Sequence, residues 1–300
     1  MTNHKNLRLS GIIPAVITPF DNNGNVDIDS LKVNVKWLIN CGVHGIMVNG
    51  CTGEAANLSP EERIQVVKTA AKEAQGKIPV IAGTGVPSTR ETVKLTIDAK
   101  DAGADAAMVV TPFFLIPNEK GLINHYKTVS EKADIPIVVY HIPQHTNVHL
   151  LPKDVNKLCE KVPNIVALKD SYGNVGEFAE TFRLVGNKIS VLTGGDDLLL
   201  PAFIVGAHGA IVAIGNIAPK IAVEIFNSVK NGEIENAREK YFKLLPIAKA
   251  IGSAINFPAP VKAAINLLGR PAGLVRSPIV PSTEKEIETI KNALTYAGLY

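Results

Sequence analysis

The chain of 300 residues is poor in cysteine and aromatic residues and has no long apolar run. Its three cysteines, Cys41, Cys51 and Cys159, form neither a C-x-x-C pair nor a zinc-type spacing with histidine. So sparse and odd a count favours a reducing compartment over a disulfide framework. No apolar stretch approaches the roughly 20 residues that span a bilayer, and the N-terminus lacks the apolar core of a signal peptide. We therefore expect a cytoplasmic protein with no membrane partner.

An excess of charge is missing too, because the formal net charge is only +3. No basic cluster has the character of a nucleic-acid footprint, so we expect no nucleic-acid partner. Apolar residues make up 46% of the chain and charged residues 20%, and both values are ordinary for a globular protein. A chain of this length is long enough for a single large barrel.

What the sequence does contain is a regular alternation of short apolar runs and amphipathic segments. The runs are rich in valine and isoleucine, as in parallel strands covered on both faces, and they comprise residues 12–18, 44–49, 78–83, 105–111, 135–140, 164–169, 189–194 and 209–215. Helices are predicted at residues 31–39, 64–74, 92–102 and 121–133, with start signals at 59–62 and 87–91. Eight such units predict an α/β fold of the (β/α)8 TIM-barrel class. A doubly wound open sheet shares the alternation, but no G-x-G-x-x-G follows the first run and no P-loop occurs.

About three more helices are predicted after the eighth unit, between Glu233 and Leu299. One of them begins in the segment Asn256-Phe257-Pro258-Ala259-Pro260, and no low-complexity tract precedes them. We therefore divide the chain into a barrel that carries the active site, residues 1–232, and a C-terminal helical extension that packs on it, residues 233–300.

Two chemically active side chains end neighbouring predicted strands, where a barrel of this class has its active site. Lys169 closes one strand, and a partly dry cavity favours the neutral amine that attacks a ketone to form a Schiff base. Tyr140 closes the strand before it, and its phenol could pass protons during imine formation. The alternatives are a lysine that reaches solvent or pairs with Asp170, and a tyrosine that packs its ring at the rim.

The turn Gly50-Cys51-Thr52-Gly53 follows another predicted strand. Because the turn is small, its backbone N–H groups could hold a carboxylate; the alternative is a plain connection into the next helix. A cysteine hydrolase lacks an assignable histidine or asparagine partner here. His141 and His145 are four residues apart, but Pro143 argues against the helix that a metal-binding pair with this spacing needs, so we predict no metal site.

Taken in order, the motifs resemble the dihydrodipicolinate synthase / N-acetylneuraminate lyase family of class I aldolases. The likeness extends from Gly11 to about Gly298, and its motifs are Gly50-Cys51-Thr52-Gly53-Glu54, Thr111-Pro112-Phe113-Phe114, Tyr140-His141-Ile142-Pro143, Leu168-Lys169-Asp170, Gly194-Gly195-Asp196-Asp197 and Gly209-Ala210-Ile211. The resemblance implies a lysine Schiff base with pyruvate or another 2-oxo acid, an aldehyde as the other small molecule, and no cofactor or metal. It also implies a homotetramer built as a dimer of dimers.

Roles carry over to matching positions. By the resemblance, Lys169 is the Schiff-base lysine and Tyr140 the proton-shuttling tyrosine. Cys51 and Thr52 hold the 2-oxo acid carboxylate and join the proton relay, within the turn that Gly50 and Gly53 keep small. Ile211 matches a residue whose backbone carbonyl faces the imine.

Three positions depart from the synthases of this family. Cys51 replaces a threonine, and a thiol is the weaker hydrogen-bond donor. Phe114 replaces a tyrosine, so one relay hydroxyl is missing. His145 replaces an arginine that grips the carboxylate of aspartate semialdehyde, and a neutral histidine cannot form a bidentate charged clamp.

These departures lead us to predict a pyruvate-type lyase that cleaves a 2-keto-3-deoxy sugar acid, as 2-keto-3-deoxygluconate aldolase does. The run Lys169-Asp170-Ser171 is also closer to such aldolases. One alternative is 4-hydroxy-tetrahydrodipicolinate synthase, which joins pyruvate and aspartate semialdehyde in lysine biosynthesis. Dehydration or deamination on the same lysine, and a catalytically silent barrel that binds a 2-oxo acid, are the others.

Overall fold

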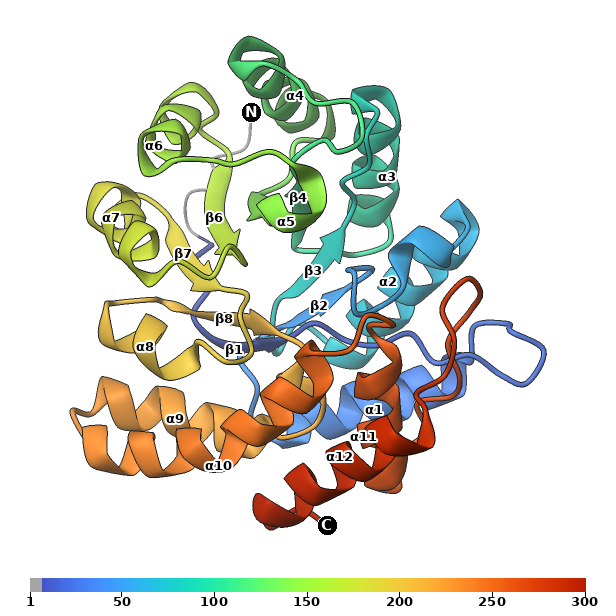
Figure 1. Cartoon of the computed structure of the whole chain (residues 1–300). Helices are drawn as coiled ribbons and strands as arrows, with labels where there is room; N and C mark the ends of the chain where they lie inside the picture. Colours follow the sequence, from blue (N-terminus) through green and yellow to red (C-terminus); the bar gives the residue numbers. More distant parts are fainter. Residues whose placement is uncertain (1–6) are drawn as a thin grey trace.

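Eight parallel strands form one sheet among residues 7–300, the part of the chain that this computed structural model describes (Figure 1). The strands are β1 (Gly11–Pro14), β2 (Ile46–Val48), β3 (Val80–Gly83), β4 (Ala106–Val110), β5 (Ile137–His141), β6 (Ile165–Asp170), β7 (Ser190–Thr193) and β8 (Gly209–Val212). Their spatial order is β1-β8-β7-β6-β5-β4-β3-β2. A parallel bridge between Ala15 and Met47 brings the two ends of the sheet together, and the Val16 N–H donates to the Met47 carbonyl at 2.7 Å. The predicted TIM barrel is confirmed.

Helices follow the strands and surround the barrel (Figure 1). They are α1 (Ile28–Asn40), α2 (Pro60–Ala74), α3 (Thr89–Asp101), α4 (Glu119–Ala133), α5 (Pro143–Thr146), α6 (Pro152–Lys161), α7 (Val175–Val185), α8 (Leu199–Ile204) and α9 (Pro219–Lys230). The four helices predicted from periodicity begin two to four residues earlier than expected, because capping side chains lie further upstream. Asp27, Ser59, Ser88 and Asn118 each accept a backbone N–H of the first turn.

The first apolar run, residues 12–18, forms a shorter strand than its sequence suggests. Strand β1 ends at Pro14; Ala15 and Val16 still bond to β8 and β2, but Ile17 and Thr18 bond to loops at the mouth of the barrel. The Ile17 N–H donates to Asn216 Oδ1 at 3.4 Å, and Thr18 Oγ1 donates to the Gly53 carbonyl at 2.7 Å. Hydrophobicity marked the burial of this run but could not separate strand from buried loop.

Side chains fill the interior of the barrel, so it is a packed core and not a pore. The inward-facing residues come from all eight strands and include Ile13, Met47, Ile81, Met108, Val138, Ala167, Leu192 and Ile211. Tyr140 belongs to the same cluster. This apolar floor closes the barrel below the carboxyl ends of the strands.

Three further helices lie beside α9 and α1 in Figure 1: α10 (Ile234–Gly252), α11 (Ala259–Leu267) and α12 (Glu284–Tyr296). Helix α10 packs on α9, and α12 packs on α10 and α11. Arg270 extends over the ring of Trp37 at 3.6 Å and donates to Asn34 Oδ1 at 3.1 Å, which ties the segment after α11 to α1. The assignment of residues 1–232 and 233–300 as separate units stays a prediction. Within residues 7–300, no helix combines the length and apolar character that a bilayer crossing requires.

Candidate active site

Lys169 and Tyr140 are directly opposite each other at the carboxyl ends of β6 and β5. The strands pair in a register that makes these two residues partners, so their side chains emerge on the same face, into the barrel. Lys169 Nζ lies 4.2 Å from the centroid of the Tyr140 ring, and each residue is only 7% exposed. The alternative of a lysine that reaches solvent is therefore not supported, because the amine lies against an aromatic face inside the mouth.

Burial lowers the pKa of the Lys169 amine. Loss of water around the ammonium lowers the pKa of Lys169 to about 8, while the charges of Cys51 and Asp196 act in the opposite direction. With that pKa, about a tenth of the amine is neutral at pH 7, against less than a thousandth for an exposed lysine. A neutral amine in a nearly dry pocket is the form that attacks a carbonyl carbon.

Tyr140 is held as a neutral phenol. Burial raises the pKa of Tyr140, and a hydrogen bond with the Ser171 side chain only partly offsets that rise. A phenol that keeps its proton at neutral pH is able to donate it to a leaving hydroxyl and take it back, as a general acid–base group does. The rim-packing alternative does not describe this side chain, because it lies inside the mouth beside the amine.

Gly194 makes room for the lysine stem. A Cβ atom at this position would lie 2.7 Å from Lys169 Cε and 2.0 Å from Ser171 Oγ. Only glycine permits such an approach without displacing both side chains. Gly194, directly after β7, is thus part of the wall around the amine.

The turn Gly50–Gly53 follows β2 and lies between that strand and α2. Thr52 and Gly53 are buried, whereas the Cys51 side chain is open to solvent at the mouth. Among the hydrogen bonds of residues 7–300, the N–H groups of Cys51 and Thr52 have no protein acceptor, so both remain available to a bound anion. Loss of water around the sulfur raises the pKa of the Cys51 thiol, although the charge of Lys169 acts in the opposite direction. This argues against a thiolate nucleophile.

Asp196 is a site residue that sequence reasoning named only as part of a motif. Its Oδ1 accepts the Ile214 N–H at 2.8 Å, and burial raises the pKa of Asp196 to about 6. Its charge favours the protonated form of Lys169. The sequence does show an acidic residue directly after the Gly-Gly pair that follows a predicted strand. It does not show that this residue lies near Lys169.

His141 and Asp170 form a buried clamp, each one residue after Tyr140 and Lys169 on its strand. They are register partners on β5 and β6, and His141 Nδ1 lies 3.2 Å from Asp170 Oδ1. His141 Nε2 accepts the Leu150 N–H at 3.1 Å, so Nδ1 carries the proton and donates it to Asp170. The alternative that Lys169 pairs with Asp170 is wrong, because Asp170 is committed to this histidine.

The remaining predicted positions lie around the mouth. Ile211 is fully buried in β8. His145 is exposed on α5, and this one-turn helix begins at Pro143. His141 lies on β5, so the two histidines do not share a helix, as expected; Pro143 occupies the first position of α5, to which proline is well suited. Phe114 is 92% exposed with φ of 68°, and no contact in residues 7–300 brings it to Lys169.

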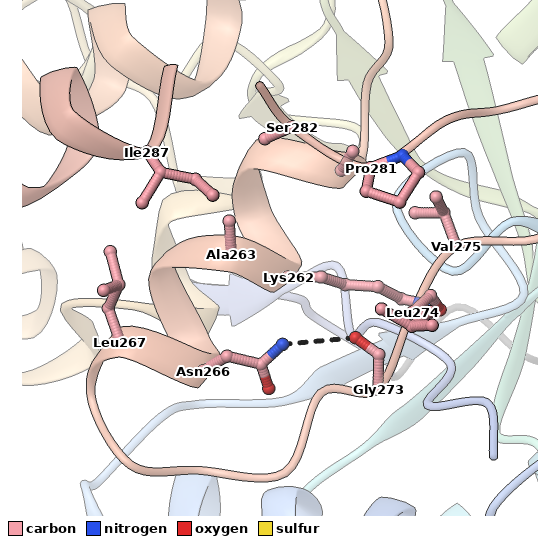
Figure 2. A pocket seen from close by; sticks show the side chains of 11 residues that line it. Lys262, Ala263, Asn266, Leu267, Gly273, Leu274, Val275, Pro281, Ser282 and Ile287 are labelled. Carbon is pink, nitrogen blue, oxygen red and sulfur yellow. Dashed lines mark hydrogen bonds between the residues drawn. The ribbon is translucent and has the colours of Figure 1, made fainter. Parts of the chain in front are cut away.

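Two features lie outside this constellation. Within the described chain, no group of three histidine, cysteine or carboxylate side chains is arranged to hold a metal ion. An apolar cavity of about 330 Å³ lies beside α11, in the helical extension (Figure 2). Its lining residues begin at Ala259, so it is not part of the mouth that holds Lys169.

Comparison with known proteins places this geometry in a family. A sequence model of the dihydrodipicolinate synthetase family matches residues 8–297. The 4-hydroxy-tetrahydrodipicolinate synthase of Methanothrix thermoacetophila is 41% identical over 286 residues, which cover 95% of this chain and 96% of the relative. The enzyme of the same name from Methanocaldococcus jannaschii is 41% identical over 289 residues, 96% of this chain and 99% of the relative.

Solved structures agree with that match. A chloride-inhibited dihydrodipicolinate synthase from Acinetobacter baumannii, crystallised with pyruvate, is 37% identical with a TM-score of 0.93 and covers 97% of this chain and 99% of its own. A protein described as the first monomeric dihydrodipicolinate synthase variant is 36% identical with a TM-score of 0.94, covering 97% of this chain and 98% of its own. The barrel with its helical extension is therefore shared by both along nearly their whole length.

Proposed function

The chain belongs to the dihydrodipicolinate synthetase family and is a carbon–carbon lyase of the class I aldolase type, and from this we propose that it forms an imine between Lys169 and pyruvate. The observation that carries the proposal is the buried amine with a pKa of about 8, set against Tyr140 at the strand ends. Pyruvate is the natural 2-oxo acid to consider, since a structural relative was crystallised with it.

We assign each step of the reaction to a group of the site. The neutral Lys169 amine attacks C2 of pyruvate, and the Tyr140 phenol supplies the proton with which the C2 hydroxyl leaves as water. The pyruvate carboxylate lies on the free N–H groups of the turn, and the Thr52 hydroxyl donates to it. The protonated imine then withdraws electrons, so that loss of a C3 proton gives an enamine. The enamine carbon attacks an aldehyde in synthesis, and the reverse step cleaves the same bond.

Condensation with aspartate semialdehyde is the first candidate for the complete reaction. Two relatives that match almost end to end at 41% identity are both named 4-hydroxy-tetrahydrodipicolinate synthase. This support favours the synthase, which was the alternative in the sequence analysis, over the sugar-acid aldolase predicted there. In this reaction the aldehyde carries its own carboxylate, and the site needs a cation to bind it.

Cleavage of a 2-keto-3-deoxy sugar acid is the second candidate, and the residues at the aldehyde end favour it. His145 is exposed at the position where the synthases have a gripping arginine. Phe114 supplies no hydroxyl, and the Cys51 thiol is a weak donor. A hydroxylated aldehyde has no carboxylate, so its binding does not need a permanent positive charge at position 145.

Assembly and location complete the proposal. We expect a homotetramer, and an exposed apolar run supports an interface in the loop after β4: Phe114 is 92% exposed, Leu115 75% and Ile116 56%. Measurement of the mass in solution against a protomer of 32.0 kDa checks this. Membership in the family does not itself require assembly, since one structural relative is described as monomeric. Cytoplasmic location stays a prediction.

Borohydride trapping with pyruvate, followed by peptide mass mapping, tests the proposed chemistry. A reduced pyruvyl adduct on Lys169 supports the lyase. A folded protein that binds pyruvate without an adduct would be the silent barrel considered above. The two candidate reactions are then compared by initial rates with aspartate semialdehyde plus pyruvate and with 2-keto-3-deoxygluconate.

The rate of adduct formation should follow the protonation of Lys169. Below pH 8 the amine is mostly protonated and cannot attack, so the trapping rate should rise about tenfold between pH 7 and pH 9 and then level off. The measurement is the cyanoborohydride inactivation rate at saturating pyruvate. Asp196→Asn removes a charge that favours the ammonium, and we expect it to shift the midpoint to lower pH. A rate that still climbs steeply beyond pH 10 would show an unperturbed lysine.

Replacing His145 with arginine should improve the use of an aldehyde that bears a carboxylate. Arginine offers a permanent charge and two parallel donors, and a charge-assisted bond of this kind is worth about tenfold in the half-saturating concentration of aspartate semialdehyde. Steady-state kinetics measure it, and His149→Arg, an exposed histidine of the same segment, is the matched control. If neither variant differs from the parent, His145 does not determine the aldehyde end.

A further inference from the structure

One ion pair between the barrel and the helical extension is almost completely buried. Glu54 follows the carboxylate-binding turn directly, and Lys262 lies on α11. Lys262 Nζ and Glu54 Oε1 are 2.6 Å apart, with side-chain exposures of 2% and 1%. Removing two charges from water is costly, and a buried pair is therefore weak evidence for stability alone. Its position behind the turn suggests a role in the geometry of the site.

Each partner of the pair makes further contacts. The Lys262 ammonium also donates to the Leu274 carbonyl at 2.6 Å and lies 4.2 Å from the centroid of the Phe20 ring. Figure 2 shows its side chain extending from α11 toward Leu274, along one wall of the apolar cavity. The second carboxylate oxygen of Glu54 accepts the backbone N–H of Arg276 at 3.0 Å. The Glu54 side chain is thus held from two segments of the extension.

The backbone at Glu54 and Gly53 is also restricted, so fixing the Glu54 side chain fixes the turn before it. Glu54 has φ of 52°, in the left-handed region that is unfavourable for a residue with a side chain. On the other side, Thr18 Oγ1 donates to the Gly53 carbonyl at 2.7 Å. A Cβ atom at Gly53 would lie 2.9 Å from the Val16 carbonyl oxygen. The turn is therefore fixed between the segment that follows β1 and the Glu54 side chain, and Gly53 at its end has no room for a larger residue.

We propose that Glu54 and Lys262 are positioning residues that hold the Gly50–Gly53 turn, and through it the free N–H groups of Cys51 and Thr52, at the place where the 2-oxo acid carboxylate binds. Neither residue touches the substrate. The inference rests on the proposed function, because it assigns the turn to the pyruvate carboxylate. It also gives the extension a role in the active site: α11 supplies the cation that fixes the turn.

The test is the pyruvate concentration that half-saturates borohydride trapping, which needs no knowledge of the aldehyde. Lys262→Met should raise this concentration about ten- to a hundredfold, because a displacement of about 1 Å in binding groups has effects of that size. The trapping rate at saturating pyruvate should change much less, since Lys169 and Tyr140 lie on other strands. The double variant Glu54→Gln/Lys262→Met leaves no unpaired buried charge and serves as the test if the single variant folds poorly. It should show the same rise in the half-saturating pyruvate concentration.

A stability control separates positioning from general loosening of the extension. Ile290→Ala removes a fully buried side chain from α12 without touching the ion pair, and its Tm should fall while the half-saturating pyruvate concentration stays within about twofold of the parent. An unchanged pyruvate concentration in folded Lys262 and double variants would overturn the inference and leave the proposed function intact. An equal rise in Ile290→Ala would overturn it as well. A parent protein without any adduct would overturn both.

Discussion

Replacing Lys169 with alanine should reduce turnover by about 10⁴-fold or more and eliminate the pyruvyl adduct, while the protein still folds. The expected size follows from the loss of a catalytic nucleophile, whose removal has effects of this order in other enzymes. The fold should survive because the lysine has no ion-pair partner within residues 7–300 that would be left unpaired, and alanine is small enough for the space beside Gly194. Turnover, adduct mass and circular dichroism measure the three results.

Two variants give the control for this experiment. Lys169→Arg keeps a positive charge but offers no amine that forms an imine, so it should be as inactive as alanine. Lys188→Ala changes an exposed lysine and should leave both turnover and trapping unchanged. Appreciable activity of Lys169→Ala, or an adduct on another lysine, would remove the basis of the imine mechanism.

Tyr140→Phe should lower turnover by about 10²- to 10⁴-fold, the range over which general acid–base groups contribute. The phenyl ring keeps its place against the Lys169 amine, so binding of pyruvate should change little. The slow steps should be those that move protons at C2, and accumulation of the adduct should become slower than in the parent. Initial rates and the time course of trapping measure the effect.

Tyr126 provides a matched control within the same chain. It is also a fully buried tyrosine, and its hydroxyl donates to the Val109 carbonyl at 3.0 Å between the barrel and its helices. Tyr126→Phe should cost about 1 kcal/mol of unfolding free energy for the lost bond and leave kcat near the parent value. If the two variants lose activity equally, the Tyr140 hydroxyl has only a structural role.

The comparison of the two tyrosines also shows where sequence reasoning stops. Tyr140 lies on the apolar strand β5 and Tyr126 within the helix α4; both are buried, but only Tyr140 points into the barrel. Strand periodicity marks alternate faces, and in a parallel barrel both faces are apolar, so the pattern does not say which face is the interior. The register of β5 and β6 decides it, by making Tyr140 and Lys169 partners.

The sequence by itself determined the barrel, the helical extension, the family and the lysine. Each follows from local patterns or from motifs that are recognised by their order along the chain, and each depends on few long-range contacts. Only the tertiary structure decided which groups surround that lysine, Gly194 and Asp196 from the segment after β7 and the His141–Asp170 clamp, and that Lys262 lies behind the turn. These contacts join residues that are distant in sequence, and the desolvation that lowers the pKa of Lys169 arises from all of the packing around it. Sequence patterns specify which elements form, whereas burial and charge at one point depend on how those elements meet.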